Sequence, residues 1–211
     1  MVTLQEYLRN PCGLLSIPYY KAINLTLPQG VLVIHDSQWN AEVKYSAHQR
    51  FFRLIHNLHT ITTVNPTYYT LVVATSTDYD DIVEIINACY DNIDMSIDRL
   101  INMSMQPTYC PQLWVMAKDS EGMSVGCALA DYDSNSGEVS LEWVQVLPRY
   151  RGKGIAQALV QRLLAYASTF ARFTTVSGDV DNVTNPQALY RKCGFIGNDI
   201  WHIVRIDNER V

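Results

Sequence analysis

The stretch VQVLPRYRGKGIA, residues 144–156, decides how this chain folds and where its chemistry lies. Alternating apolar residues end at Pro148, and a loop with two glycines leads directly into a long apolar-periodic segment. Glycines let the backbone approach a ligand closely, and a helix start offers unpaired N–H donors and a positive dipole end. The stretch therefore predicts a strand, a phosphate-binding turn and a helix, with a plain glycine-rich turn as the alternative.

Two other phosphate-binding motifs are excluded. The dinucleotide fingerprint G-x-G-x-x-G requires a third glycine at the position of Gln157. The pattern G-x-x-x-x-G-K-[ST] of P-loops occurs nowhere in the chain.

The segments around this stretch, from residue 68 onward, have a regular order. Their periodicity and turn residues predict a strand at 69–74, helices at 78–90 and 96–105, strands at 113–118, 125–132 and 138–147, a helix to about 170, a strand at 173–177, a helix from Asn185 to Gly194 and a strand at 201–206. Four apolar residues of the second helix are expected to form one inward stripe: Ile97, Leu100, Ile101 and Met105. The chain thus reads as an α/β domain over residues 68–211.

Residues 1–67 are expected to form a small α/β extension. A short helix is expected at 3–9, a strand at 30–35, and a helix at 46–58 because its large apolar residues recur at helical spacing. Asn65-Pro66 predicts a break before the main domain. The aromatic, proline-containing segments at 11–13 and 16–21 are expected to line or cover a binding cleft, to complete the core, or to form a homodimer contact.

The composition excludes several classes of protein. The net charge is -5, from 16 Lys+Arg against 21 Asp+Glu, and no basic stripe suggests nucleic-acid binding. The five cysteines are scattered without a CxxC pair, so neither a disulfide framework nor a zinc site is expected. The start of the chain lacks the pattern of a signal peptide, and no apolar run approaches the roughly 20 residues of a membrane span. A cytoplasmic protein with no membrane partner is predicted.

Two motifs together resemble a known family. The string Arg151-x-x-Gly154-x-Ala156, entered through residues 144–148, resembles the acetyl-CoA signature of the GNAT superfamily of N-acetyltransferases. The string ALYRKCGF, residues 188–195, is similar to the closing helix and turn of that family. The resemblance covers residues 68–206 and implies a mixed, mostly antiparallel sheet that splays open between its fourth and fifth strands, flanked by helices.

The resemblance also implies where acetyl-CoA, the acyl donor, would bind. The pantetheine arm would pair with the fourth strand and the pyrophosphate would sit on the amides of the glycine loop. The expected cofactor-binding residues are Val144, Gln145, Val146, Arg151, Gly152, Lys153, Gly154, Ile155, Ala156, Asn182, Asn185 and Tyr190. Asn182 and Asn185 straddle the usual family spacing, and Asn185 also has a structural explanation as a helix N-cap.

The resemblance assigns Tyr190 as the general acid that protonates the departing thiolate. Glu142 is the expected base for the amine, Glu138 is a second candidate, and water is the alternative to both. Asp179 and Asp181 could contact a cationic acceptor, or be solvated. The three histidines His48, His56 and His59 are expected to pack or face solvent rather than bind a metal, and Cys193 is expected to pack rather than act as a nucleophile.

The predicted function is N-acetyl transfer from acetyl-CoA to a primary amine by direct attack in a ternary complex. The acceptor could be a small molecule or a protein amine. A non-catalytic acyl-CoA sensor on the same fold is the alternative.

Overall fold

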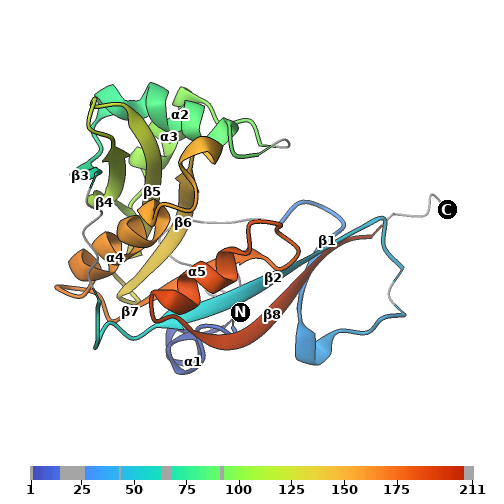
Figure 1. Ribbon diagram of the computed structural model, residues 1–211. Helices are drawn as coiled ribbons and strands as arrows, with labels where there is room; N and C mark the ends of the chain where they lie inside the picture. Colours follow the sequence, from blue (N-terminus) through green and yellow to red (C-terminus); the bar gives the residue numbers. More distant parts are fainter. Residues whose placement is uncertain (1, 15–26, 43, 63–67, 91–92, 207–211) are drawn as a thin grey trace.

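The computed structural model describes residues 2–14, 27–42, 44–62, 68–90 and 93–206. Within these residues one eight-stranded sheet is flanked by helices (Figure 1). The helices are α1 (Leu4–Arg9), α2 (Tyr79–Asn87), α3 (Ile97–Ser104), α4 (Ile155–Ala167) and α5 (Pro186–Lys192). The strands are β1 (Val31–His35), β2 (Ala47–His56), β3 (Thr70–Val73), β4 (Tyr109–Lys118), β5 (Ser124–Asp133), β6 (Glu138–Val146), β7 (Phe173–Asp179) and β8 (Ile196–Arg205). Short 3-10 turns lie at Asp36–Gln38, Ser76–Asp78 and Pro148–Tyr150.

The sheet has the order β1-β8-β2-β7-β6-β5-β4-β3, and its pairs are antiparallel except for β6 with β7. The parallel pairing of β6 and β7 extends only from Glu138↔Phe173 to Leu141↔Val176. Beyond Leu141 the two strands separate, so the last part of β6 has no strand partner on that side. Counted from β3, they are the fourth and fifth strands, which confirms the predicted splayed, mixed sheet.

Alternating side chains along the strands build two cores, one on each face of the sheet. Leu113 and Val115 of β4 pack in the core that holds the apolar residues of α4, whereas Trp114 and Met116 pack in the core that holds those of α2 and α3. Because successive strand residues point to opposite faces, the sheet separates α4 from α2 and α3 (Figure 1). Both cores extend along the part of β6 beyond Leu141, where β6 has no partner on the β7 side; this side is called the open edge of β6.

One predicted helix is wrong. Residues 47–56 form β2, which pairs with β7 on one side and β8 on the other. Phe52, Arg53 and Leu54 are consecutive and all buried, because both faces of this strand are covered. A strand buried on both faces loses the polar/apolar alternation that distinguishes a strand from a helix.

The expected inward stripe of α3 is also wrong for three of its four members. Leu100 is fully buried, but Ile97 and Ile101 are each 41% exposed and Met105 is 72% exposed. The helix has only 8 residues, and its packed face consists of Leu100 and the partly buried Met103, so the other apolar positions face solvent.

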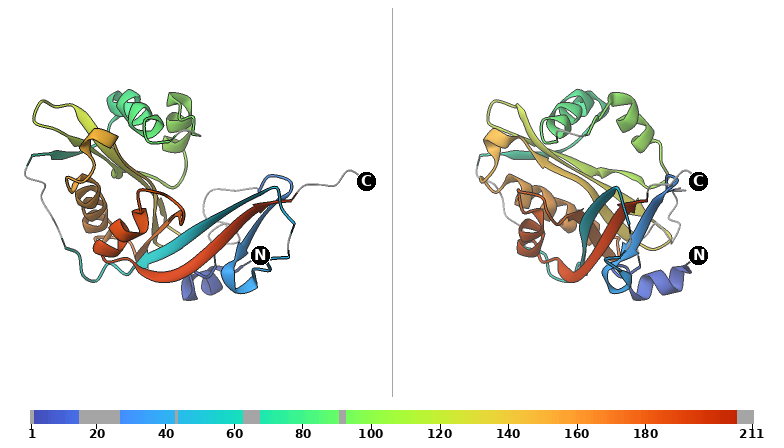
Figure 2. Two further views of the ribbon diagram at one scale, coloured as in Figure 1. Left: turned by 45° about the vertical axis from the view of Figure 1, so that its right-hand side comes forward. Right: turned by 90° about the vertical axis from the view of Figure 1, so that its right-hand side faces the viewer.

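The N-terminal region joins the sheet through β1 and β2, and Figure 2 shows these strands and β8 extending as an arm away from α2 and α3. The predicted helix at 3–9 and strand at 30–35 are confirmed as α1 and β1. Helix α1 begins with a capping box between Thr3 and Glu6. The predictions for residues 16–21 and 65–66 lie outside the described residues.

Candidate acetyl-CoA cleft and active site

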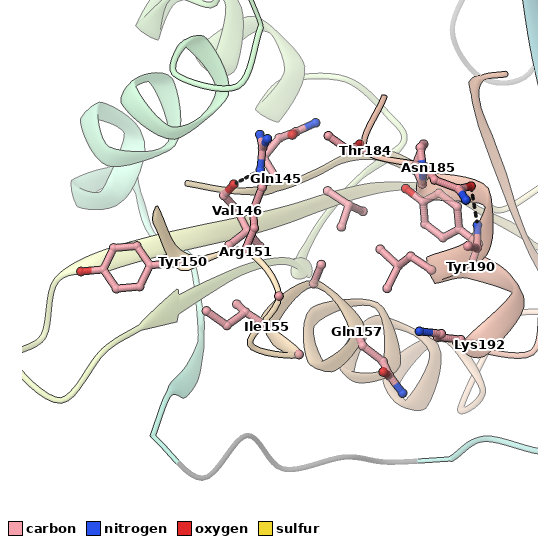
Figure 3. A pocket seen from close by; sticks show the side chains of 17 residues that line it. Gln145, Val146, Tyr150, Arg151, Ile155, Gln157, Thr184, Asn185, Tyr190 and Lys192 are labelled. Atoms are coloured by element: carbon pink, nitrogen blue, oxygen red, sulfur yellow. Dashed lines mark hydrogen bonds between the residues drawn. The ribbon is translucent and has the colours of Figure 1, made fainter. Parts of the chain in front are cut away.

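A cleft of about 520 Å³ opens where β6 separates from β7 (Figure 3). Its walls come from the end of β6, the loop into α4, the first turn of α4, and α5 with the loop before it. The lining residues are Val144, Gln145, Val146, Tyr150, Arg151, Gly152, Gly154, Ile155, Ala156, Gln157, Thr184, Asn185, Pro186, Ala188, Leu189, Tyr190 and Lys192.

The start of α4 presents unpaired backbone donors to this cleft. Gly152 and Gly154 have φ angles of +76° and +79°, which glycine adopts without strain. Ala158 is the first residue whose N–H bonds back into the helix, to the Gly154 carbonyl at 3.0 Å. The N–H groups of residues 155–157 therefore have no acceptor in the helix, and Gly154 supplies no side-chain cap. This arrangement suits a pyrophosphate.

Open space lies directly above the glycine loop. A Cβ added to either Gly152 or Gly154 would meet no atom within 4 Å. The two glycines are therefore required for the turn of the backbone and leave its amides uncovered. The glycine loop and the start of α4 therefore have room for the phosphate groups that the sequence predicts at this position.

The open edge of β6 offers a second set of backbone groups. The Leu147 N–H donates to the Val125 carbonyl at 3.0 Å, and the Gln145 carbonyl faces Gly126 of β5. Because backbone groups alternate in direction along a strand, those of Val144 and Val146 point to the other side, away from β5. The Val146 carbonyl accepts from Arg151, so the peptide groups of Val144 remain available to a ligand in the cleft.

Arg151 and Lys153 of the loop make different contacts. Arg151 Nε donates to the Val146 carbonyl at 3.1 Å, which turns its side chain back along β6 (Figure 3). Lys153 is not among the lining residues, and its Nζ lies 5.0 Å from the centre of the Tyr150 ring. Arg151 lines the cleft and adds its charge to the backbone donors there, whereas Lys153 does not line it.

Tyr190 lies on α5 with its ring packed between Phe52 and Phe195, at centroid distances of 6.1 and 5.7 Å. Only 7% of the residue is exposed, yet it lines the cleft (Figure 3). Burial raises the pKa of Tyr190 above its usual value, with a smaller contribution from the nearby phenol of Tyr90. The hydroxyl therefore keeps its proton at neutral pH.

Of the two asparagines predicted to bind the cofactor, Asn185 lines the cleft and Asn182 does not. Asn185 lines the cleft and caps α5, its Oδ1 accepting from the Ala188 N–H at 3.3 Å. The Asn182 Oδ1 accepts from the N–H and the hydroxyl of Thr184, at 2.9 and 2.7 Å. Asn182 thus shapes the turn, and Thr184 reaches the cleft in its place.

Of the two carboxylates considered as a base, Glu142 is exposed and Glu138 is buried. Leu141 and Trp143 pair with adjacent residues of β5, which leaves Glu142 in a β-bulge beside the open edge but outside the residues that line the cleft. Glu138 accepts hydrogen bonds from Tyr7, Arg53 and Thr175, so its carboxylate has a structural role.

The remaining polar residues have other contacts. Asp181 pairs with Arg50 at 2.7 Å, and the Asp179 Oδ1 accepts from the Asp181 N–H. His56 accepts from the Leu58 N–H. His48 is hydrogen-bonded to His202, which also bonds to Asp36. Among the described residues no group of three or more His, Cys, Asp or Glu could hold a metal ion.

Cys193 is buried beside Tyr190, and burial raises the pKa of its thiol to about 11. A thiol with such a pKa is a poor source of thiolate at neutral pH.

Ten of the twelve predicted cofactor-binding residues line the cleft, and Lys153 and Asn182 do not. The lining residues that the sequence reading missed are Tyr150, Gln157, Thr184, Pro186, Ala188, Leu189 and Lys192. Gln157 could have been found, because the third amide of a helix start belongs to the same anion site as the first two. The residues of α5 depend on how this helix is placed against α4, which the sequence does not show.

Comparison with known proteins agrees with this geometry. Residues 111–196 match the family model described as an acetyltransferase (GNAT) domain. An acetyltransferase of Photorhabdus laumondii is 30% identical over 86 residues, which are 41% of this chain and 57% of that protein. The chain thus spans little more than half the length of this curated relative.

Solved structures show the same fold. A GCN5-related N-acetyltransferase of Sphaerobacter thermophilus superposes with a TM-score of 0.66 and 22% identity over 76% of this chain and 52% of that one. A phosphinothricin acetyltransferase of Sinorhizobium meliloti, in complex with AcCoA, has a TM-score of 0.53 and 20% identity over 66% of this chain and 88% of that one. No helix in the described part of the chain is long and apolar enough to cross a membrane. Residues 111–196 thus match a GNAT acetyltransferase domain, and the described residues have the fold of the solved GNAT structures.

Proposed function

We propose that this protein is an N-acetyltransferase that moves the acetyl group of acetyl-CoA to a primary amine by direct attack in a ternary complex. The observation that carries the proposal is the cleft itself. It combines the free amides at the start of α4, the unpaired peptide groups of Val144 and the buried hydroxyl of Tyr190. The acceptor is a small-molecule amine or an amine of a protein.

Each part of the cleft has a role in this reaction. The amides of residues 155–157 would hold the pyrophosphate, and the peptide groups of Val144 would pair with the pantetheine arm. The amine nitrogen attacks the thioester carbonyl, the carbon–sulfur bond breaks, and the amine loses its proton to water or to Glu142. A backbone N–H at the edge of β6 would stabilise the oxyanion.

Tyr190 would act on the leaving sulfur. Its raised pKa keeps the hydroxyl protonated, so it can donate a hydrogen bond to the sulfur as negative charge develops there. The same raised pKa makes a lasting phenolate unfavourable, so the proton that Tyr190 gives to the thiolate must be replaced at once.

A non-catalytic sensor would use the same cleft to bind CoA without turnover. Thermal unfolding with acetyl-CoA, CoA and NADH tests binding, because a ligand at a hundredfold excess over its Kd stabilises the native state by about 2.7 kcal/mol. Stabilisation by the two CoA species alone is expected. If neither raises the melting temperature, the proposed donor site is wrong.

Turnover separates the enzyme from the sensor. With a panel of amines, release of the CoA thiol is expected for at least one acceptor, and Tyr190→Phe should lower kcat while the affinity for acetyl-CoA stays near normal. CoA binding without thiol release for any small or peptide amine would favour the sensor.

A further inference from the structure

The last turn of α5 carries two basic side chains, Arg191 and Lys192, which have different surroundings. Arg191 donates to the carbonyls of Phe195 and Gly197, so its guanidinium holds the turn into β8. Lys192 is exposed and lines the cleft, and it forms no hydrogen bond or ion pair with another residue in the described part of the chain. One of the two charges therefore has a structural role, and the other is available to a ligand.

The cleft is positively charged in a protein whose net charge is -5. Among the described residues that line it, only Arg151 and Lys192 are charged, and neither an aspartate nor a glutamate is present. A concave site lined by one sign of charge attracts ligands of the opposite charge. The side chains of the cleft thus favour an anionic ligand, in addition to the free amides at the start of α4.

The two cations approach the cleft from different walls. Arg151 follows β6, and its Nε is bound to the Val146 carbonyl. Lys192 belongs to α5, and Figure 3 shows its side chain extending toward the first turn of α4, where Gln157 lies. Gln157 is the last residue whose N–H has no acceptor in α4. The Lys192 ammonium group therefore reaches the start of α4 from the α5 side.

Lys192 and Tyr190 serve different parts of the same cleft, although only one residue separates them in α5. Side chains two positions apart leave a helix about 200° from each other. Figure 3 accordingly shows the Tyr190 ring beside Asn185 and Lys192 on the side of Gln157. Lys192 thus lies toward the free amides of α4 rather than beside the tyrosine hydroxyl.

We propose that Lys192 binds a phosphate group of the CoA nucleotide from the α5 side of the cleft and so contributes to the affinity for the acyl donor. The proposal rests on the proposed function, in which CoA species bind here. Two groups of CoA carry this chemistry, the diphosphate and the phosphate on the ribose. Dephospho-CoA keeps the first and lacks the second, so the two ligands together identify the group that Lys192 contacts.

Isothermal titration of the full chain with CoA and, separately, with dephospho-CoA tests this. Lys192→Met keeps an unbranched stem and removes the charge. It should weaken CoA binding about three- to tenfold, between the effects of an exposed ion pair and of a buried charged hydrogen bond. Lys192→Arg should retain the affinity because it keeps the charge. Arg162→Met is the matched control: Arg162 is an exposed cation of α4 that does not line the cleft, so its loss should leave CoA affinity unchanged.

Salt distinguishes an electrostatic contact from a change in the shape of the cleft. Between about 0.1 M and about 1 M salt the Debye length falls from about 10 Å to about 3 Å, so the difference between the unmodified protein and Lys192→Met should shrink. A difference that persists undiminished at high salt would overturn the proposal. CoA affinity in Lys192→Met equal to that in Arg162→Met would overturn it as well.

The two ligands assign the phosphate. Equal weakening of CoA and dephospho-CoA by Lys192→Met supports a contact with the diphosphate, and weakening of CoA alone supports a contact with the ribose phosphate. If the unmodified protein binds neither ligand, the proposed function fails first, a result distinct from all of these. Melting temperatures of the variants, measured without ligand, identify any loss that comes from unfolding.

Discussion

The guanidinium of Arg53 lies 3.1 Å from the carboxylate of Glu138, and the two side chains are only 5% and 0% exposed. Arg53 also donates to the Pro11 carbonyl at 2.9 Å and to the hydroxyl of Tyr7 at 2.9 Å. The ion pair therefore links β2 to β6, and the hydrogen bond from Arg53 to Tyr7 links both strands to α1.

Glu138→Ala should destabilise the protein by about 3–5 kcal/mol, because it leaves the Arg53 charge buried without its partner. Equilibrium unfolding in urea measures the loss. The control is Arg50→Met on the same strand, whose ion pair with Asp181 is largely exposed and whose removal should change stability far less. Equal losses in the two variants would contradict a special contribution from the buried pair.

Substitution of Gly154 should abolish CoA binding beyond its effect on stability. Gly154→Trp forces a side chain into the space above the free amides and requires a positive φ of a residue that disfavours it. Gly122→Trp is the matched control, because Gly122 has a φ of +82° and equally open surroundings but does not line the cleft. Thermal shift with CoA should show loss for the first variant and retention for the second. Retained affinity in Gly154→Trp would refute the anion site.

His56 should make the protein less stable in mild acid. Burial lowers the pKa of His56, and its Nδ1 accepts from the Leu58 N–H at 2.9 Å, so the folded state requires the neutral ring. Stability from this group is complete above the unfolded pKa of about 6.5 and is lost as the pH falls toward the lower folded pKa. Urea unfolding at pH 7.5 and 5.5 should show a smaller pH effect in His56→Asn, whose Oδ1 can still accept from Leu58. An unchanged pH effect would assign the loss to other groups.

Leu100 and Met105 should differ sharply although both belong to the apolar pattern of one helix. Leu100→Ala removes a fully buried side chain and should cost about 2–5 kcal/mol. Met105→Ala changes a side chain that is 72% exposed and should alter stability by at most about 0.5 kcal/mol. Denaturant midpoints of the two variants measure this directly. A large loss in Met105→Ala would mean that another surface covers this face of α3.

The phosphate end of the cleft could be predicted from the sequence because its chemistry is local. Gly152, Gly154 and the amides that follow them are contiguous, so the loop that binds and the helix that supplies the dipole are read from one string. Thr184 and Lys192 could not be found in this way, since they reach the cleft only through the packing of α5.

The errors in the fold have physical causes that no local pattern records. Phe51, Leu54 and Ile55 recur at helical spacing, yet β7 and β8 pair with both edges of this segment and make it a strand. Ile101 is 41% exposed because α3 packs through Leu100 and Met103, a choice of face that depends on tertiary packing. The sequence shows which residues are apolar, and tertiary packing decides which of them are buried.

Strand β2 pairs with β7 and β8, two strands that are synthesised much later than β2 itself. Phe51 pairs with Asp179 of β7 and with Trp201 of β8, so β2 is synthesised more than 100 residues before the two strands between which it lies. Contacts so distant along the chain slow folding, and the waiting segment is a target for chaperones or for self-association on the ribosome. β1 also pairs with β8, so both early strands keep an unpaired edge until residues 196–205 have been made.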